Sequence, residues 1–313
     1  MGSQGLRPRF QTGRSLSAVV LGWAFFDAMA AAPTAAAPRP KSMPDLLKLN
    51  AIASTTRFAL LVRESTRFWL RVALRSRRVG RYRVRDSDVV VHIRHGTVDV
   101  MTLDEIFRCG HYDLPPPVAE ALRSVPRPLR VVDLGANIGL FGAYIKSLFP
   151  DAVITAFEPH PENAGVLRRS IEANGGEEDW RLIEACADVR DGSVPFSVDE
   201  FTTSRIESTA TATMVPAVDV FPFLEDVDLL KIDIEGAEWR LLADPRFASV
   251  AARAIGLEYH PHRCPDPDPG ALARRLLAEA GYRTLETDFE LPPGHGMLWG
   301  WRSEVTLVGQ GGS

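Results

Sequence analysis

The clearest pattern in the chain is a short apolar run that leads into a glycine-containing turn and then into an apolar helix. Residues 129–134 are almost continuously apolar, as in a parallel strand that is buried on both faces. The turn 135–139 follows, and apolar residues then recur with helical spacing over 140–149, up to Pro150. A strand, a turn and a helix in this order predict a ligand site at the end of the strand.

Strands and helices alternate along the rest of the chain. The expected strands are 129–134, 153–157, 180–186, 194–198, 211–220 (a strand or an extended loop), 227–234, 254–259, 282–287 and 297–301. The expected helices between them are 140–149, 163–174, 237–242 and 270–280. This alternation predicts an α/β fold with a Rossmann-like, doubly wound and mostly parallel sheet.

The region before the first core strand predicts an N-terminal extension of helices and a hairpin. Residues 44–78 predict one or two helices with a basic face, formed by Arg63, Arg67, Arg71 and Arg75. Such a face can lie on an anionic membrane or on a partner, but we favour a solvated face packed on the main domain. The remaining elements expected in this region are a hairpin over 82–93 with its turn at 86–88, and helices at 103–107 and 118–124.

Composition divides the chain into four parts. An Ala-, Pro- and Arg-rich leader over 1–43 superficially resembles a signal peptide, but we expect a disordered extension. The other parts are the helices, hairpin and lid segment of 44–125, the main domain of 126–303 and a tail over 304–313.

Charge and cysteine content narrow the class of protein. The 313 residues are 45% hydrophobic and 24% charged, which is ordinary for a globular protein with a full core. The net charge of −4 argues against a nucleic-acid binder. Three scattered cysteines are too few for a disulfide framework or a cysteine-rich metal site, so we expect a reducing, cytoplasmic location.

The turn after the first strand has the spacing Asp-x-Gly-x-Asn-x-Gly, formed by Asp133, Gly135, Asn137 and Gly139. A dinucleotide fingerprint would read G-x-G-x-x-G instead. Asn tolerates positive φ better than other non-glycine residues, so Asn137 can replace a middle glycine. An acidic residue ahead of the first glycine suits a cationic or amine-bearing ligand better than a pyrophosphate.

A second distinctive stretch, residues 230–238, reads Leu-Lys-Ile-Asp-Ile-Glu-Gly-Ala-Glu. The turn resembles the first motif of class I S-adenosylmethionine (SAM) methyltransferases, and residues 230–238 resemble the signature of the FkbM family within that class. The resemblance extends over about Val98–Arg302 and implies a domain that binds SAM and transfers its methyl group. Within this stretch we expect Lys231 to point to the surface or to pair locally.

Glu158 is the predicted ribose-binding residue. It ends the second core strand about twenty residues past the turn, where a carboxylate can accept hydrogen bonds from both ribose hydroxyls. A nicotinamide dinucleotide would use the same carboxylate, so Glu158 alone does not choose the cofactor.

The resemblance assigns further residues to the cofactor. Ala187 and Asp188, which follow the third strand, would flank the adenine ring. Tyr112 lies in a segment similar to one that precedes the core in FkbM-like sequences, and would be either a lid residue or a packed aromatic. The predicted cofactor-binding set is Asp133, Gly135, Ala136, Asn137, Gly139, Glu158, Ala187, Asp188, Asp233 and Tyr112.

Asp233, Glu258 and His260 are the predicted catalytic residues. By resemblance, Asp233 at the end of the fourth strand faces the sulfonium and the methyl group. Glu258 and His260 match an E-x-H pattern at the end of the fifth strand. A histidine of near-neutral pKa can accept a proton from a substrate hydroxyl, so His260 is the first candidate base and Asp233 the second. A structural histidine is the alternative.

No metal site is predicted. The spacing of His260, His262 and Cys264 matches no site geometry. Asp233 together with Glu258 as a Mg²⁺ site is an alternative that the sequence leaves open.

The predicted function is SAM-dependent O-methylation of a hydroxyl on a sugar, polyketide or other secondary metabolite. The expected partner is a small-molecule acceptor, with no nucleic acid; membrane contact through the basic helices is disfavoured, and the oligomeric state is unassigned. Two alternatives stay open: a nicotinamide-dependent oxidoreductase and a non-catalytic SAM-binding protein. The missing G-x-G-x-x-G and the acidic Asp133 count against the oxidoreductase.

Overall fold

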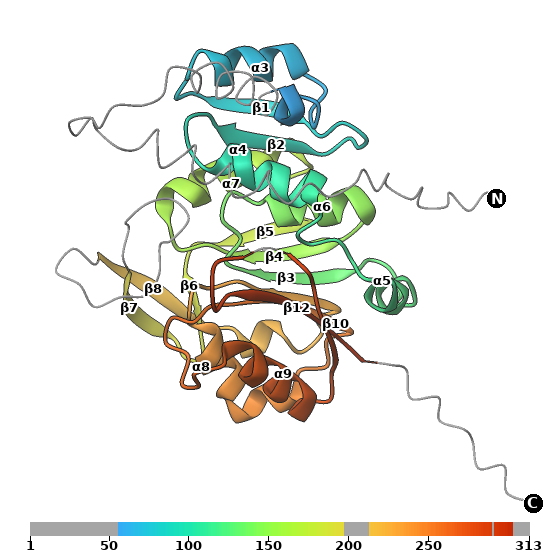
Figure 1. The fold of residues 1–313 in the computed structure, drawn as a ribbon, viewed down its shortest axis with the longest axis vertical. Helices are drawn as coiled ribbons and strands as arrows, with labels where there is room; N and C mark the ends of the chain where they lie inside the picture. The colour runs from blue at the N-terminus through green and yellow to red at the C-terminus, as the bar shows by residue number, and fades with distance from the viewer. Residues whose placement is uncertain (1–55, 197–212, 290, 303–313) are drawn as a thin grey trace, which may run out of the picture. The chain divides into compact units, whose positions relative to one another are not determined.

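The computed structural model describes residues 56–196, 213–289 and 291–302 (Figure 1). The predicted leader over 1–43 and the tail over 304–313 lie outside the described residues. So do the beginning of the predicted helical region 44–78, the end of the predicted strand 194–198 and the beginning of 211–220.

The central sheet has seven strands in the order β11-β12-β10-β9-β3-β4-β5. Five neighbouring strands are parallel, and β12 runs antiparallel to both β10 and β11. The prediction of a Rossmann-like, mostly parallel sheet is therefore confirmed. The strands are β3 Arg130–Leu134, β4 Val153–Phe157, β5 Trp180–Ile183, β9 Leu229–Ile232, β10 Ala254–Tyr259, β11 Arg283–Glu286 and β12 Gly296–Trp301.

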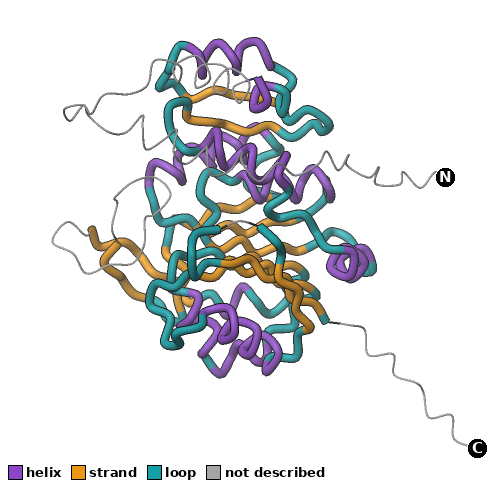
Figure 2. The backbone as a smooth tube through the Cα atoms, viewed as in Figure 1, coloured by secondary structure: helices purple, strands orange, loops and turns teal. Residues whose placement is uncertain are grey.

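Helices cover both faces of this sheet, as Figures 1 and 2 show. Alternate residues of β3 enter opposite cores, because side chains on a strand point to opposite faces. Val131 packs into the core beneath α6 and α7, whereas Val132 and Leu134 pack into the core beneath α8 and α9. The helices are α6 Leu140–Leu148, α7 Pro161–Ala173, α8 Glu238–Ala243 and α9 Pro269–Glu279.

The third predicted strand, 180–186, is wrong at its end. β5 stops at Ile183, whose carbonyl accepts hydrogen bonds from the N–H groups of Glu158 and Ala185, at 3.1 and 3.0 Å. The chain turns there and leaves the central sheet. Residues 186–188 form a separate strand in a smaller sheet of order β6-β8-β7, with β6 Cys186–Asp188, β7 Gly192–Phe196 and β8 Thr213–Asp219.

The N-terminal extension contains the predicted hairpin, though it begins earlier than the sequence indicated. β1 and β2 pair antiparallel, and β2 is attached to α7 because Asn174 and Ser170 accept hydrogen bonds from its backbone N–H groups. The predicted helix at 103–107 is the end of α4 followed by a π-helical turn, η1. The elements are α3 Ser65–Ala73, β1 Val79–Arg83, β2 Val90–Arg94, α4 Asp99–Asp104, η1 Glu105–Cys109 and α5 Pro116–Arg123.

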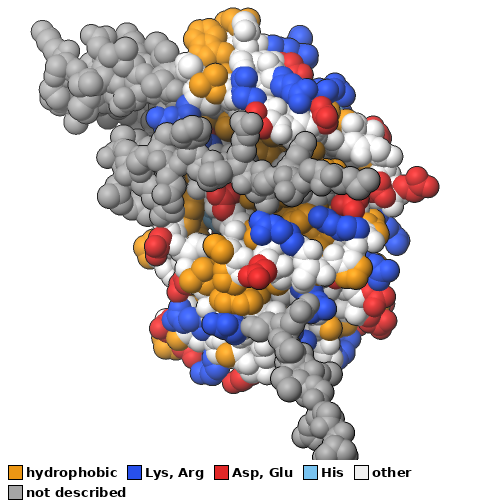
Figure 3. Space-filling view, turned by 90° about the vertical axis from the view of Figure 1, so that its right-hand side faces the viewer, with side chains coloured by type: hydrophobic (Ala, Val, Ile, Leu, Met, Phe, Trp, Pro, Cys, Tyr) orange, Lys and Arg blue, Asp and Glu red, His pale blue; other side chains and the backbone are white. Residues whose placement is uncertain are grey.

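Part of the predicted basic face is bound within the extension itself. Arg71 on α3 donates to the carbonyl of Val79 at 3.2 Å, and Arg63 donates to the carbonyl of Ser87 at 2.7 Å. In the face shown in Figure 3, basic and acidic side chains are interspersed. None of the helices in the described part of the chain combines the length and apolar character that crossing a bilayer requires.

The turn between β3 and α6 touches the end of β9 through the backbone. Gly135 has φ +79°, and a Cβ atom there would lie 1.8 Å from the carbonyl oxygen of Asp233. Only a glycine allows this contact. The turn is therefore fixed against the strand end that carries the predicted catalytic carboxylate.

We expect Gly135→Ala to lower the free energy of unfolding by at least about 3 kcal/mol, because the backbone of one strand end must move. Gly281→Ala is the matched control: its φ is +86°, but a Cβ atom there meets nothing within 4 Å. Backbone strain alone should cost this control about 1 kcal/mol. Equal losses in chemical denaturation would contradict the steric argument.

Candidate functional site

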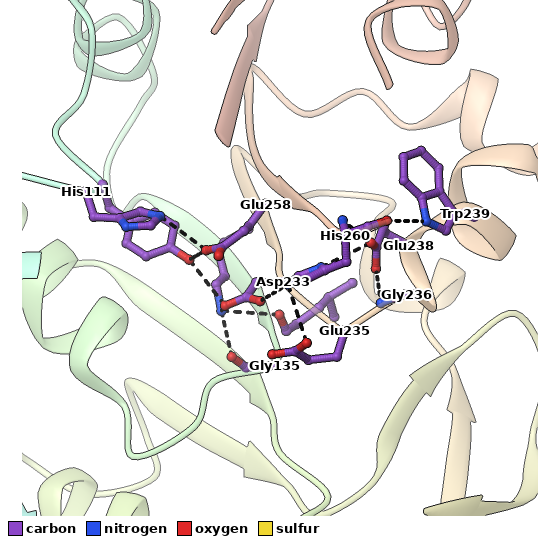
Figure 4. A network of polar contacts seen from close by, with 12 residues as sticks. His111, Gly135, Asp233, Glu235, Gly236, Glu238, Trp239, Glu258 and His260 are labelled. Atoms are coloured by element: carbon purple, nitrogen blue, oxygen red, sulfur yellow. Dashed lines mark hydrogen bonds and ion pairs between the residues drawn. The ribbon is translucent and has the colours of Figure 1, made fainter. Parts of the chain in front are cut away.

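Charged side chains from three strand ends converge at the carboxyl edge of the central sheet (Figure 4). β3 lies between β4 and β9, and the chain leaves β3 toward β4, so the β3–β9 boundary is the switch point of the sheet. Open α/β sheets bind their ligands at this point. Asp133 and Lys231 are direct partners across these two strands.

Lys231 is the buried cation of the site. Its ammonium lies 3.3 Å from Asp133 and 3.2 Å from Asp233, and it donates a 2.6 Å hydrogen bond to the carbonyl of Gly135. Burial opposes the charged form, but the carboxylates of Asp233 and Asp133 outweigh it and raise the pKa of Lys231. The expectation of a surface position for Lys231 is wrong, and the expectation of local pairing is correct.

Asp133 is completely buried beneath the turn. Its carboxylate oxygens make an ion pair with Lys231 but accept no hydrogen bond from the described residues. Burial raises the pKa of Asp133, and Lys231 opposes that rise. The sequence suggested that an acid at this position suits a cationic or amine-bearing ligand; in the structure Asp133 is paired with the ammonium of Lys231.

Glu158, the predicted ribose-binding residue, lies directly against the turn. Its carboxylate accepts hydrogen bonds from the backbone N–H groups of Asn137 and His160, at 2.7 and 2.8 Å. Burial raises the pKa of Glu158 to about 7, although these hydrogen bonds lower it. Asn137 has φ +51°, so the expectation that it replaces a glycine in the turn is correct.

The other predicted cofactor residues are divided between the turn after β3 and the smaller sheet. Ala136 is buried and donates its N–H to the carbonyl of Phe157, and Gly139, with φ +85°, precedes α6. Ala187 and Asp188 lie on β6 of the smaller sheet. The carboxylate of Asp188 is bound by Arg240 at 2.9 Å.

Tyr112 joins the segment after η1 to two strand ends. Its hydroxyl donates to Glu258 at 3.1 Å and lies 3.3 Å from Asp233. His111 makes an ion pair with the same Glu258 carboxylate at 3.2 Å. Burial would raise the pKa of Glu258, but His111 outweighs it, and that pKa falls to about 2. With two partners on one carboxylate, Glu258 is placed to fix both Tyr112 and His111.

His260 faces the acids of the neighbouring strand end. Its Nε2 lies 3.5 Å from Glu235 and 3.8 Å from Asp233, and its Nδ1 lies 3.1 Å from Glu238. Burial would lower the pKa of His260, but these carboxylates raise it to about 10, with Glu238 the largest contributor. Two of the predicted catalytic residues, His260 and Asp233, are thus brought together.

The turn after β9 carries a further acid, Glu235, whose side chain is partly exposed. Glu235 has φ +52°, an uncommon conformation for a residue that is not glycine. Burial raises its pKa to about 7, and neighbouring carboxylates add to the rise while His260 opposes it. Strained residues of this kind cluster at functional sites.

Within the part of the chain that the structure describes, ligand-type atoms of Asp233, Glu235 and His260 lie within 4.8 Å of one another. This group differs from Asp233 with Glu258, the alternative that the sequence left open, and from His260 with His262 and Cys264, whose spacing argued against a metal site. Within it, His260 contacts the carboxylates of Asp233 and Glu235 as ion pairs, at 3.8 and 3.5 Å.

Sequence reasoning missed the roles of His111 and Glu238. His111 adjoins Tyr112, which was selected, but nothing in the sequence indicated its distant partner Glu258. Glu238 ends the distinctive stretch 230–238, but nothing in the sequence indicated that its side chain is fully buried against His260. Both contacts join residues that are far apart in the chain.

Comparisons with known proteins show which family this chain is similar to. Residues 133–284 match the model of the methyltransferase FkbM domain, as the motifs predicted. Methyltransferase sdnD of Sordaria araneosa is 29% identical over 177 residues, covering 44% of this chain and 65% of the relative. Methyltransferase 1 of Beauveria bassiana is 29% identical over 166 residues, covering 44% of this chain and 64% of the relative.

The matched part of this chain spans 65% and 64% of the length of these two relatives, slightly less than two thirds. Among solved structures, a precorrin-6y C5,15-methyltransferase from Geobacter metallireducens is similar, with a TM-score of 0.37 and 16% identity. The alignment covers 61% of this chain and 92% of that one.

We expect Lys231→Met to lower the free energy of unfolding by about 3–5 kcal/mol, because it leaves two carboxylates without their buried counter-charge. Lys146→Met is the matched control, since Lys146 is also buried but makes no ion pair with the described residues. That control should change stability by less than about 1 kcal/mol. If both variants unfold at the same denaturant concentration, the ion pair does not stabilise the sheet edge.

Proposed function

We propose, from the premise that residues 133–284 form a methyltransferase FkbM domain, that this chain methylates a hydroxyl group with SAM as the donor. The acceptor would be a sugar, polyketide or other secondary metabolite. The observation that carries the proposal is the meeting of His260 with Asp233 beside the turn that contacts Glu158.

The residues at the sheet edge are suited to a cationic nucleoside. The turn has the backbone conformation that its glycines permit, and Glu158 lies against it with a carboxylate that could bind a ribose. Asp233 and Glu235, each about a quarter exposed, offer negative charge beside that position. These groups would hold SAM; its sulfonium carries an electrophilic methyl group and leaves as a neutral thioether.

The protein then has two tasks: to align the acceptor hydroxyl with the methyl group and to remove the proton of that hydroxyl. The acceptor oxygen uses a lone pair to form the O–CH₃ bond, the electrons of the C–S bond stay on sulfur, and Nε2 of His260 takes the hydroxyl proton. His260 must be neutral to do this, so a cation beside Asp233 and Glu235 would favour catalysis by weakening the hold of these acids on its proton.

Tyr112 supports the placement of these groups. By binding both Asp233 and Glu258 it closes one side of the site with a buried hydroxyl, which remains protonated because burial raises its pKa. It could thus act as the lid residue that the sequence suggested, and its packing against Phe141 accounts for the aromatic alternative as well.

Titration calorimetry with SAM and with NADH tests the cofactor directly. We expect SAM to bind and NADH not to bind. Glu158→Ala should weaken SAM binding about tenfold or more, which is about 1.4 kcal/mol or more, because a charged hydrogen-bond acceptor is lost. Binding of NADH alone would favour the oxidoreductase alternative.

The control for this variant is Glu172→Ala, which removes an exposed carboxylate from α7. Its SAM affinity should equal that of the unaltered protein. Since Glu158 also binds the backbone of the turn, circular dichroism must first show that Glu158→Ala is folded. An unchanged affinity in the folded variant would remove Glu158 from the cofactor site.

We expect His260→Asn to lower the rate of methyl transfer about 100-fold or more, because the proton acceptor is lost. The raised pKa of His260 means that the neutral form grows as pH increases, so kcat/KM of the unaltered protein should rise from pH 7 toward about 10. This rise should vanish in the variant. The measurement is transfer of radiolabelled methyl from SAM across a panel of hydroxyl acceptors.

His92→Asn is the control, because His92 lies on β2 against Ser170 and away from the strand ends. Its rate and pH profile should be unaltered. SAM binding without methyl transfer to any hydroxyl in the panel would favour a non-catalytic SAM-binding protein. A pH profile of His260→Asn that matches the unaltered protein would assign the proton to another base.

A further inference from the structure

Glu238 begins α8, and its side chain is completely buried. One carboxylate oxygen accepts a 2.8 Å hydrogen bond from the backbone N–H of His260 and lies 3.1 Å from Nδ1 of the same residue. The other oxygen accepts a 2.7 Å hydrogen bond from the N–H of Gly236. One buried side chain thus ties the turn after β9 to the end of β10 (Figure 4).

This geometry determines which nitrogen of His260 carries the proton in the neutral ring. An ionised carboxylate accepts hydrogen bonds and donates none, so Nδ1 is the donor in the contact with Glu238. Nε2 then has the free lone pair. It is also the nitrogen that lies nearer to Asp233 and Glu235, the partly exposed acids of the cluster.

The residue that follows Glu238 binds the same histidine through an uncharged side chain. Trp239 donates its indole N–H to the carbonyl of His260 at 3.0 Å. Glu238 therefore binds the backbone N–H of His260 and Trp239 binds its carbonyl, but only Glu238 also contacts the ring. A variant of Trp239 therefore tests the structural role alone, whereas a variant of Glu238 also tests control of the imidazole.

We infer that Glu238 is a positioning residue: its carboxylate keeps the proton on Nδ1 of His260, so that Nε2 is the nitrogen that takes the acceptor proton. The inference rests on the proposed function for the identity of the reaction, but its geometry does not depend on a ligand. A carboxylate that orients a catalytic histidine in this way fixes both ring direction and tautomer.

A carboxamide cannot replace the carboxylate. Glutamine has one acceptor oxygen, while Glu238 receives three donors on two oxygens. Glu238→Gln must therefore face an N–H group with its own NH₂, or turn the imidazole into the other tautomer. It also removes the negative charge nearest to His260.

Several charged or titratable groups face His260 from the surrounding elements, so the effect of Glu238 must be separated from theirs. They are Asp233 and Glu235 in the turn after β9, Glu238 on α8, Glu258 on β10 and His295, whose ring centroid lies 5.2 Å away.

The test is an NMR titration of ¹⁵N-histidine-labelled full-length protein without SAM or acceptor. We expect Glu238→Gln to lower the pKa of His260 by at least about one unit, a tenfold loss of proton affinity. The protected Nδ1 proton signal of the unaltered protein should disappear. Trp239→Phe should lower the unfolding temperature but leave the pKa of His260 unaltered.

Glu286→Gln is the matched control. Glu286 accepts a hydrogen bond from Tyr259, the residue before His260, and its loss should not affect His260 itself. If Glu238→Gln does not fold, Glu238→Asp takes its place: it keeps the charge but not the reach, and should lose the Nδ1 signal. A His260 pKa within about 0.3 unit of the unaltered value, with the Nδ1 signal intact, would overturn the inference.

These outcomes are independent of the proposed function. The titration needs neither SAM nor an acceptor, so its failure would bear on Glu238 alone. Failure of the unaltered protein to bind SAM would instead contradict the proposed function while leaving the contact between Glu238 and His260 in place.

Discussion

The ion pair of Lys231 with Asp133 and Asp233 is the contact on which the site depends. It joins two parallel strands at the point where the direction of chain progression through the sheet reverses, and its hydrogen bond to Gly135 extends it to the turn. Removing a charge from such a buried group leaves the others uncompensated, which is far more costly than losing an exposed pair. Turn, strand and acid are therefore held in one arrangement.

The other carboxylates of the site differ in their partners and in their pKa values because their surroundings differ. Glu258 is bound by His111 and Tyr112 and stays ionised, while Glu235, at the edge of the site, has a pKa near 7. Asp233 contacts both Lys231 and Tyr112 and still lies near Nε2 of His260. A surplus of carboxylates that share few cations favours a cationic ligand, which is the physical basis of the proposed preference for a sulfonium.

The N-terminal extension contributes directly to this site. The segment that follows η1 places His111 and Tyr112 over the ends of β9 and β10, and the hairpin that precedes it is attached to α7 by side-chain hydrogen bonds. Residues before the first core strand thus bind the same carboxylates that the strand ends carry. In Figure 4 the contacts of His111 and Glu258 continue into those of Asp233 and His260.

The sequence by itself determined the order of strands and helices, the doubly wound sheet and the convergence of Asp133, Glu158, Asp233 and His260 at one edge. These follow from local patterns, because a buried strand, a glycine turn and an acid at a strand end are each visible within a few residues. Only the tertiary structure decided which acids share a cation, that β5 ends before Cys186, and that Glu238 and His111 belong to the site. Such contacts join residues distant in the chain, and their burial and charge balance exist only when the strands are side by side.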